Sequence, residues 1–213
     1  MTSTEPDYLP AAGHDALLPC YDLLSRVFGI GRYHRRLVEL ADLGSSRDVL
    51  DIGCGTGNLT FAAKRAWPQV QLVGLDPDPR ALARAQKKVK GRNGIRFERG
   101  YAQDLPYADA TFDRVLSAFM LHHLPDAARP ALAAEVLRVL RPGGALYLVD
   151  IAGHLHPSDG MMARHELRSR HIQHNLGDGV PRLLGTAGFD CVELDSRAGR
   201  VGRATFYRAT KPQ

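Results

Sequence analysis

The sequence contains few of the residues that build disulfide-rich or metal-binding proteins. Only three of its 213 residues are cysteines, and Cys20, Cys54 and Cys191 stand far apart. An odd, sparse set without zinc-ligand spacing predicts reduced thiols and a cytoplasmic protein. No apolar run approaches the ~18 residues of a membrane span. The first ten residues are polar and acidic, which is not the pattern of a signal peptide.

Runs of like charge, repeats and low-complexity tracts are also missing. The formal net charge is +5, and arginine outnumbers lysine 23 to 5. A basic excess permits a nucleic-acid or anionic-lipid partner, but charges scattered along the chain favour neither. The composition, 44% hydrophobic and 24% charged, is ordinary for a soluble globular protein. The length suits one domain that can bury a substantial core.

Strand-like and helix-like segments alternate regularly from residue 47 onward. We expect strands at 47–52, 71–76, 94–100, 112–119 and 145–151, with helices at 57–66, 79–90 and 131–140. The RPGG sequence at 141–144 is expected to end the last of these helices. Such alternation predicts a parallel sheet with right-handed crossovers and helices on both faces.

The end of the sequence changes character. A helix near 179–187 precedes two alternating segments, 189–196 and 203–210, which predict an antiparallel hairpin. The predicted fold is therefore α/β, a Rossmann-like, doubly wound sheet of seven strands with an antiparallel C-terminal edge.

A glycine-rich turn follows the first predicted strand. Residues 49–60 read VLDIGCGTGNLT, with Asp51 followed by Gly53, Gly55 and Gly57. Glycine permits a positive φ and a close approach of ligand to backbone. The unpaired N–H groups of the next helix favour a carboxylate or phosphate. A dinucleotide fingerprint requires G-x-G-x-x-G, but the sixth position is asparagine or threonine in the two registers. The spacing therefore disfavours a dinucleotide.

A second carboxylate, Asp76, ends the second predicted strand, 19 residues after Gly57. In a doubly wound sheet the ligand lies beyond the carboxyl ends of the strands, where a carboxylate can accept hydrogen bonds from ribose hydroxyls. The alternative is a capping role, because Asp-Pro is common in turns. Together with the glycine turn, the position favours ribose.

The pattern D-x-G-x-G-x-G resembles motif I of the class I S-adenosylmethionine-dependent methyltransferases. Residues 100–126, 135–151 and 187–196 look like later segments of that family, so the resemblance covers about residues 45–209 in order. The resemblance is strongest for the small-molecule group typified by the ubiquinone/menaquinone-biosynthesis enzymes (type 11). Residues 21–36 loosely resemble the segment that precedes the sheet in those enzymes. The resemblance implies a cytoplasmic, bacterial enzyme that methylates a small-molecule or lipid-like acceptor and releases S-adenosylhomocysteine.

The resemblance also implies roles for individual residues. The backbone of the three glycines would hold the methionine moiety, and Asp51 would orient that loop or the amino group. Asp76 would bind the ribose. The adenine would be contacted by Pro77, Ala102 and Gln103, and Ser117 would line the cofactor near the sulfonium. Family members often have Gly-Asp-Ala where this chain has Gly-Tyr-Ala at 100–102. Tyr101 would stack on the adenine or donate a hydrogen bond to it, or Asp104 would take the place of the missing acid.

Methyl transfer from a sulfonium is an in-line displacement, so alignment and desolvation supply most of the catalysis. A base helps by ~10²–10⁴-fold where the acceptor is a phenol or an enolisable carbon. His122 and His123, after the fourth strand, are the candidates, with Tyr21 a weaker one. The alternatives, which we favour, are that the histidines cap the loop and that Tyr21 is a core residue.

Five of the nine histidines lie in residues 153–174, but their spacing does not match a zinc site, and we predict no metal. Residues 152–178 are expected instead to cover the acceptor. Residues 1–44 would form an N-terminal helical extension that packs as a lid rather than on a membrane, before a methyltransferase domain at 45–213. An RNA or protein methyltransferase, or a catalytically inactive S-adenosylmethionine-binding module, are the alternative functions.

Overall fold

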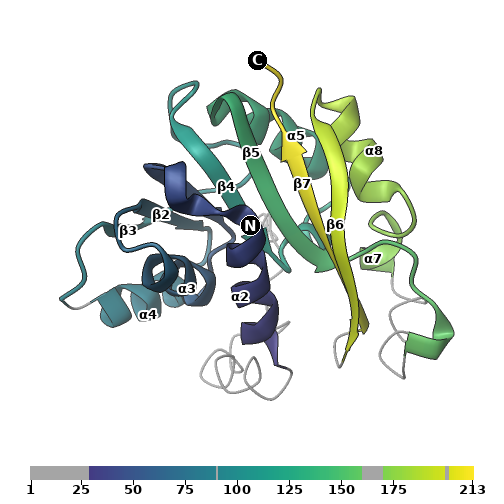
Figure 1. Ribbon diagram of the computed structural model, residues 1–213, viewed down its shortest axis with the longest axis horizontal. Helices are drawn as coiled ribbons and strands as arrows, with labels where there is room; N and C mark the ends of the chain where they lie inside the picture. Colours follow the sequence, from purple (N-terminus) through teal and green to yellow (C-terminus); the bar gives the residue numbers. More distant parts are fainter. Residues whose placement is uncertain (1–28, 90, 160–169, 200–201) are drawn as a thin grey trace, which may run out of the picture.

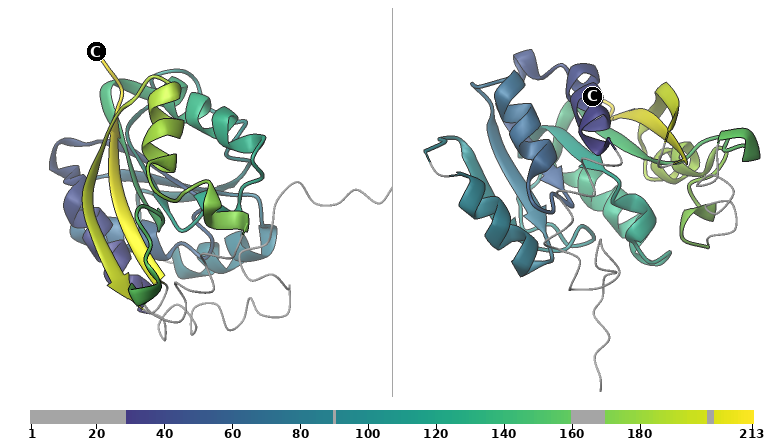
Figure 2. Two further views of the ribbon diagram at one scale, coloured as in Figure 1. Left: turned by 90° about the vertical axis from the view of Figure 1, so that its right-hand side faces the viewer. Right: turned by 90° about the horizontal axis from the view of Figure 1, so that it is seen from below.

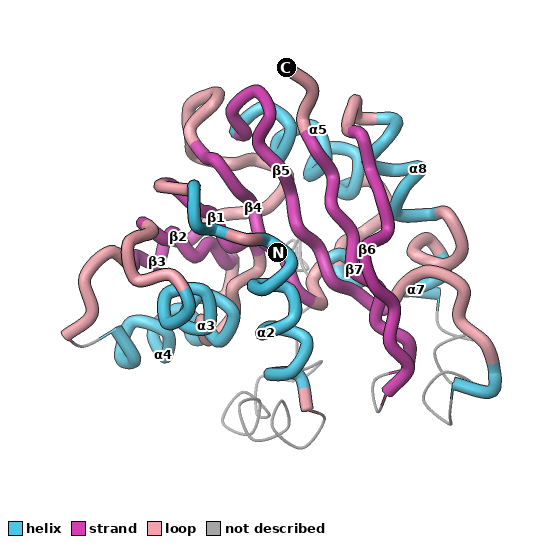
Figure 3. The backbone as a smooth tube through the Cα atoms, viewed as in Figure 1, coloured by secondary structure: helices cyan, strands magenta, loops and turns pink. Residues whose placement is uncertain are grey.

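The computed structural model describes residues 29–89, 91–159, 170–199 and 202–213 (Figure 1). A seven-stranded sheet in the order β3-β2-β1-β4-β5-β7-β6 lies at their centre. The first five strands are parallel. β7 lies between β5 and β6 (Figure 3) and is antiparallel to both. The strands are β1 Asp48–Ile52, β2 Gln71–Asp76, β3 Ile95–Arg99, β4 Phe112–Ala118, β5 Leu140–Ile151, β6 Asp190–Gly199 and β7 Gly202–Thr210.

Helices cover both faces of this sheet (Figure 2). They are α2 Ile30–Ala41, α3 Asn58–Ala66, α4 Pro79–Val89, α5 Ala128–Val139, α7 Arg170–Gln173 and α8 Gly179–Thr186, with short 3-10 turns η2 Leu43–Ser45, η3 Leu121–His123 and η4 Pro157–Asp159. Successive residues of a strand point to opposite faces. In β1, Val49 therefore packs under α2 and α3, whereas Leu50 and Ile52 pack under α5 and α8.

The predicted fold is confirmed, with one difference around the RPGG sequence. Helix α5 does end before it, but Leu140 is already extended and pairs with Phe112. The four residues therefore form the irregular start of a long β5 instead of a loop before a shorter strand. The pairing with β4 shifts register between Phe112 and Arg114, and Gly143 has a φ of +72°.

Helix α2 packs into the core of the sheet. Its Tyr33, Leu37 and Val38 are buried in the same apolar cluster as Leu59 of α3 and Tyr147 of β5. Residues 1–28 of the expected N-terminal extension lie outside the described residues, and the domain boundary at residue 44 stays a prediction. Within the described ranges, no helix is both long enough and apolar enough to cross a membrane.

Candidate active site

The carboxyl ends of four parallel strands meet at one edge of the sheet. Ile52 of β1 lies opposite Leu75 of β2 and Ser117 of β4, and Asp76 lies opposite Arg99 of β3. The ends of these strands and the loops that follow them carry the glycine turn and the other predicted site residues, apart from Tyr21, which lies outside the described residues. The predicted gathering of these residues at one edge is therefore what the structure shows.

The three glycines of the turn are required for different reasons. All have left-handed backbone, with φ of +70° at Gly53, +52° at Gly55 and +81° at Gly57. A Cβ on Gly53 would overlap the side chain of Met120, and one on Gly57 would lie 2.7 Å from Phe97 Cζ. Around a Cβ on Gly55, by contrast, no atom of the described residues lies within 4 Å. Gly55 is therefore the glycine of this turn that leaves open space for a ligand.

Asp51 lies beneath the turn, with 1% of its surface exposed. Its Oδ2 accepts a hydrogen bond of 2.5 Å from Thr60 Oγ1, which ties β1 to α3. The pKa of Asp51 is raised to about 7, mainly by burial and also by the charge of Asp76, while hydrogen bonds from Thr60 oppose the rise. These contacts fit the role of orienting the loop.

Asp76 connects the end of β2 to the glycine turn. Its Oδ2 accepts the Gly55 N–H at 2.8 Å, and its Oδ1 accepts the Asp78 N–H at 2.9 Å. Burial raises the pKa of Asp76, and these two hydrogen bonds oppose the rise. Asp76 therefore does cap the turn, as the alternative interpretation of the Asp-Pro sequence predicted. Because each carboxylate oxygen has two lone pairs, capacity remains for ribose hydroxyls.

The residues predicted to contact adenine lie beside Asp76. The Gly100 N–H donates to the Asp76 carbonyl at 3.3 Å, which brings the end of β3 next to Pro77. Tyr101 and Asp104 then pair as an isolated bridge that encloses Ala102, which is buried, and Gln103, which is half-buried. The structure thus brings these residues together, and their contacts to adenine stay predictions.

Ser117, the last but one residue of β4, lies at the expected edge, but its hydroxyl donates to the Ile52 carbonyl at 3.2 Å in the buried interior. Phe119 and Met120, which directly follow β4, were missed by sequence reasoning. Phe119 has a φ of +55°, rare for a residue with a side chain, and packs edge-on against Tyr33. Met120 then lies over Gly53. No local sequence signal marks this contact.

His122 is held by a buried carboxylate. Asp150, at the end of β5 and 0% exposed, pairs with His122 Nδ1 through its Oδ1. The same carboxylate accepts the His122 backbone N–H at 3.3 Å and the Ile151 N–H at 2.7 Å. The side chain of His122 is 14% exposed, and the His123 ring lies 4.0 Å away, centre to centre. Asp150 therefore fixes both the loop and the direction of the imidazole.

A second polar pair lies behind this one. Arg129 of α5 is buried and donates through Nη2 to Asn175 Oδ1, while its Nη1 has no hydrogen-bond partner in the described structure. Asn175 Nδ2 in turn donates to the Ile151 carbonyl at 3.2 Å. Burial lowers the pKa of Arg129, and the charges of Asp150 and Asp126 oppose this. Both residues were missed because nothing in the local sequence distinguishes them from other polar residues.

Comparison with known proteins agrees with this geometry. Residues 49–144 match a family model described as a methyltransferase domain. The chain is 35% identical over 206 residues to an uncharacterized methyltransferase of Synechocystis, covering 90% of this chain and 92% of the relative. It is 38% identical over 167 residues to a demethylmenaquinone methyltransferase of Deinococcus radiodurans, covering 76% and 67% respectively.

The chain belongs to the class I S-adenosylmethionine-dependent methyltransferases. The predicted enzyme class and the predicted methyl donor, S-adenosylmethionine, are confirmed with the family. The match to a demethylmenaquinone methyltransferase of Thermus thermophilus, 36% identical over 63% of this chain, spans only 62% of that relative's length. The acceptor is therefore a matter for proposal.

Solved structures share the fold of this methyltransferase. Human N-acetylserotonin methyltransferase in complex with S-adenosylmethionine superposes with a TM-score of 0.70 at 20% identity, covering 92% of this chain and 56% of that one. The YcgJ protein of Bacillus subtilis gives the same TM-score at 19% identity, covering 85% and 99%.

Some predicted features of this methyltransferase fall outside the described residues. Tyr21 and residues 160–169 of the histidine-rich segment are among them, so their roles stay predictions. Of the other histidines in that segment, His154 and His156 are exposed and His174 Nε2 pairs with Asp126 at 2.9 Å. No group of three or more potential metal ligands occurs in the part of the chain that the structure describes.

Proposed function

We propose that this methyltransferase methylates the ring of a reduced, quinone-like small molecule, with His122 as the base. The observation that carries the proposal is the His122–Asp150 pair, located on the same edge of the sheet as the glycine turn. Relatives named as demethylmenaquinone methyltransferase and as ubiquinone/menaquinone biosynthesis C-methyltransferase support the acceptor class. We place the enzyme in the cytoplasm.

The described residues fit S-adenosylmethionine. Gly55 leaves open space beside the backbone of the turn. The N-cap residue of α3 is Gly57, which has no side chain to cap the helix, and the positive dipole end of the helix suits the ligand carboxylate. Asp76 offers carboxylate oxygens for the ribose, and its negative charge suits a cationic ligand. When bound, S-adenosylmethionine supplies an electrophilic methyl group.

His122 is suited to remove a proton from an acceptor hydroxyl. With Nδ1 held by Asp150, Nε2 is the ring nitrogen that takes the proton, and the buried carboxylate stabilises the imidazolium that forms. Deprotonation makes the neighbouring ring carbon of a hydroquinone more nucleophilic. The new carbon–carbon bond would form as the methyl–sulfur bond of S-adenosylmethionine breaks, with S-adenosylhomocysteine as the leaving group. The ring carbon then loses its proton, the ring oxygen regains one and the ring is aromatic again, so one proton is released overall.

The test is methyl transfer from isotope-labelled S-adenosylmethionine to a demethylated naphthoquinol, with bulk RNA and protein in parallel reactions. We expect label in the quinol, and about 10²-fold lower kcat in His122→Ala, with an unchanged Kd for S-adenosylmethionine. His123→Ala is the matched control and should keep a larger share of the activity.

Label in RNA or protein but not in the quinol would overturn the acceptor. Cofactor binding without any transfer would favour an inactive binding module. Equal activity in wild type and His122→Ala would refute the role of the base.

A further inference from the structure

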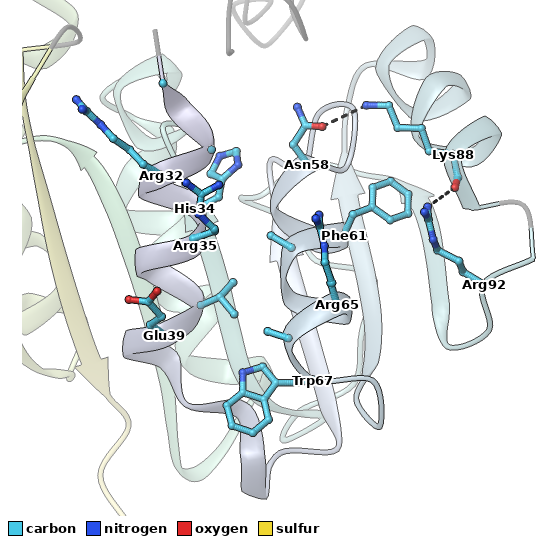
Figure 4. Close-up of a pocket in the computed structure, with 15 residues that line it drawn as sticks. Arg32, His34, Arg35, Glu39, Asn58, Phe61, Arg65, Trp67, Lys88 and Arg92 are labelled. Carbon is cyan, nitrogen blue, oxygen red and sulfur yellow. Dashed lines mark hydrogen bonds between the residues drawn. The ribbon is translucent and has the colours of Figure 1, made fainter. Parts of the chain in front are cut away.

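A groove of about 1000 Å³ lies between α2 and α3, with the end of α4 at its far rim (Figure 4). One wall is formed by residues 29–39 and the other by residues 58–67. Lys88 Nζ donates to the Thr56 carbonyl at 3.1 Å and to Asn58 Oδ1 at 3.2 Å. Because Thr56 belongs to the glycine turn, one end of the groove borders the active-site edge, although none of the proposed catalytic residues lines it.

The fold concentrates positive charge in this groove. One carboxylate, Glu39, lines it together with five cations, and Glu39 already pairs with Arg36. The groove residues therefore carry four of the five excess positive charges of the chain. The cations are Arg32, Arg35, Arg65, Lys88 and Arg92. A concave surface of one sign focuses the electric field and attracts anions.

Two of these arginines have no partner among the described residues. Arg35 from the α2 wall and Arg65 from the α3 wall are both exposed, and neither forms an ion pair or hydrogen bond with the described residues. Elsewhere the same chain does pair arginines with carboxylates, as in Arg138 with Glu135 and Arg203 with Asp159. Water and salt screen the repulsion between such exposed like charges, and an anion bound between them would offset what remains of it.

The groove favours a phosphate group without a nucleobase. A guanidinium presents a planar fork of donors that matches phosphate oxygens. Single-stranded nucleic acid would also need open aromatic faces for its bases. Phe61 and Trp67 are the two large aromatic side chains that line the groove. The Phe61 ring is covered by the Arg92 guanidinium, 5.1 Å from the ring centre, and packs edge-on against Phe97 with 5.8 Å between ring centres. Trp67 is partly buried against the apolar cluster beneath α2 and α3. We propose that this groove is a binding site for a phosphate-bearing ligand, held between Arg35 and Arg65.

The protein carries its own probe for this site, because its single tryptophan, Trp67, lines the groove. The protein is titrated with inorganic pyrophosphate, with phosphatidylglycerol vesicles, with neutral phosphatidylcholine vesicles and with a single-stranded oligonucleotide, following tryptophan fluorescence. We expect a saturable change with pyrophosphate, with phosphatidylglycerol or with both. The first result identifies a free phosphate compound as the source, and the second a lipid head group.

The double variant Arg35→Gln/Arg65→Gln should weaken that binding by at least about tenfold. The matched control, Arg182→Gln/Arg208→Gln, removes two exposed charges from α8 and β7 and should bind as wild type does. An unchanged Kd for S-adenosylmethionine in both variants shows that they are folded. Equal losses in the two double variants, no response to either phosphate source, or a response only to a single-stranded oligonucleotide would overturn the proposal.

Discussion

Replacing Gly55 by alanine separates the ligand-binding role of the glycine turn from its backbone geometry. Gly55 has a φ of +52°, so alanine there costs about 1–2 kcal/mol of backbone strain. The smaller freedom of alanine in the unfolded chain offsets about 0.4–1 kcal/mol of this. Because no described atom lies within 4 Å of the added Cβ, we expect no steric cost in the free protein. The free energy of unfolding should fall by about 1 kcal/mol.

The same methyl group would intrude where S-adenosylmethionine approaches the backbone. Overpacking of one methyl group costs about 1–3 kcal/mol, so the affinity should fall by about tenfold or more. Gly91→Ala is the matched control, since Gly91 has a φ of +74° and likewise shows no described atom within 4 Å of its Cβ. Gly91 lies in the turn between α4 and the amino end of β3, away from the carboxyl ends of the strands where the glycine turn lies.

Chemical denaturation measures the free energy of unfolding, and calorimetric titration measures the affinity for S-adenosylmethionine. The two variants should lose similar stability, and only Gly55→Ala should lose affinity. If Gly55→Ala binds S-adenosylmethionine as tightly as Gly91→Ala does, the open space at Gly55 is not the ligand site, and the argument fails.

Two carboxylates of the site give further predictions. The folded pKa of Asp51, about 7, lies above its ordinary value of 3.8, so this group destabilises the fold increasingly as pH rises from ~4 to ~7. Asp51→Asn removes that contribution. The free energy of unfolding of the variant relative to wild type should therefore rise by about 1.4 kcal/mol per pH unit between pH ~4 and ~7 and level off above that. A difference in unfolding free energy that does not change with pH would contradict this. Asp76→Asn should weaken S-adenosylmethionine binding by about 10- to 100-fold through lost charged hydrogen bonds, whereas Asp78→Asn should not, and equal Kd values in calorimetry would refute ribose binding.

The sequence predicts those parts of the fold and site that depend on local signals. Alternating apolar segments were enough to predict the strands and helices, because each element buries a periodic face. The glycine turn and Asp76 follow strands directly, so their meeting at one edge follows from parallel topology. Local signals also placed His122 on this edge.

Contacts between distant residues were beyond such reasoning. The pairing of His122 with Asp150 spans 28 positions, and that of Arg129 with Asn175 spans 46. Each depends on which loops meet after the sheet is assembled. The same is true of Met120 over Gly53, which explains why Gly53 and Gly55, alike in sequence, differ in what surrounds them.

The charge of the protein shows the same limit. Arginines that are scattered along the sequence line one groove once α2, α3 and α4 have packed together. A net charge of +5 gives no indication of such a groove by itself.

A crystal structure of the complex with S-adenosylhomocysteine tests the account of the site most directly. It should place the amino-acid portion of the ligand against Gly55 and the start of α3, with both ribose hydroxyls on Asp76 and the sulfur facing the His122 side of the edge. A ligand bound elsewhere, or one whose ribose does not contact Asp76, would contradict the account.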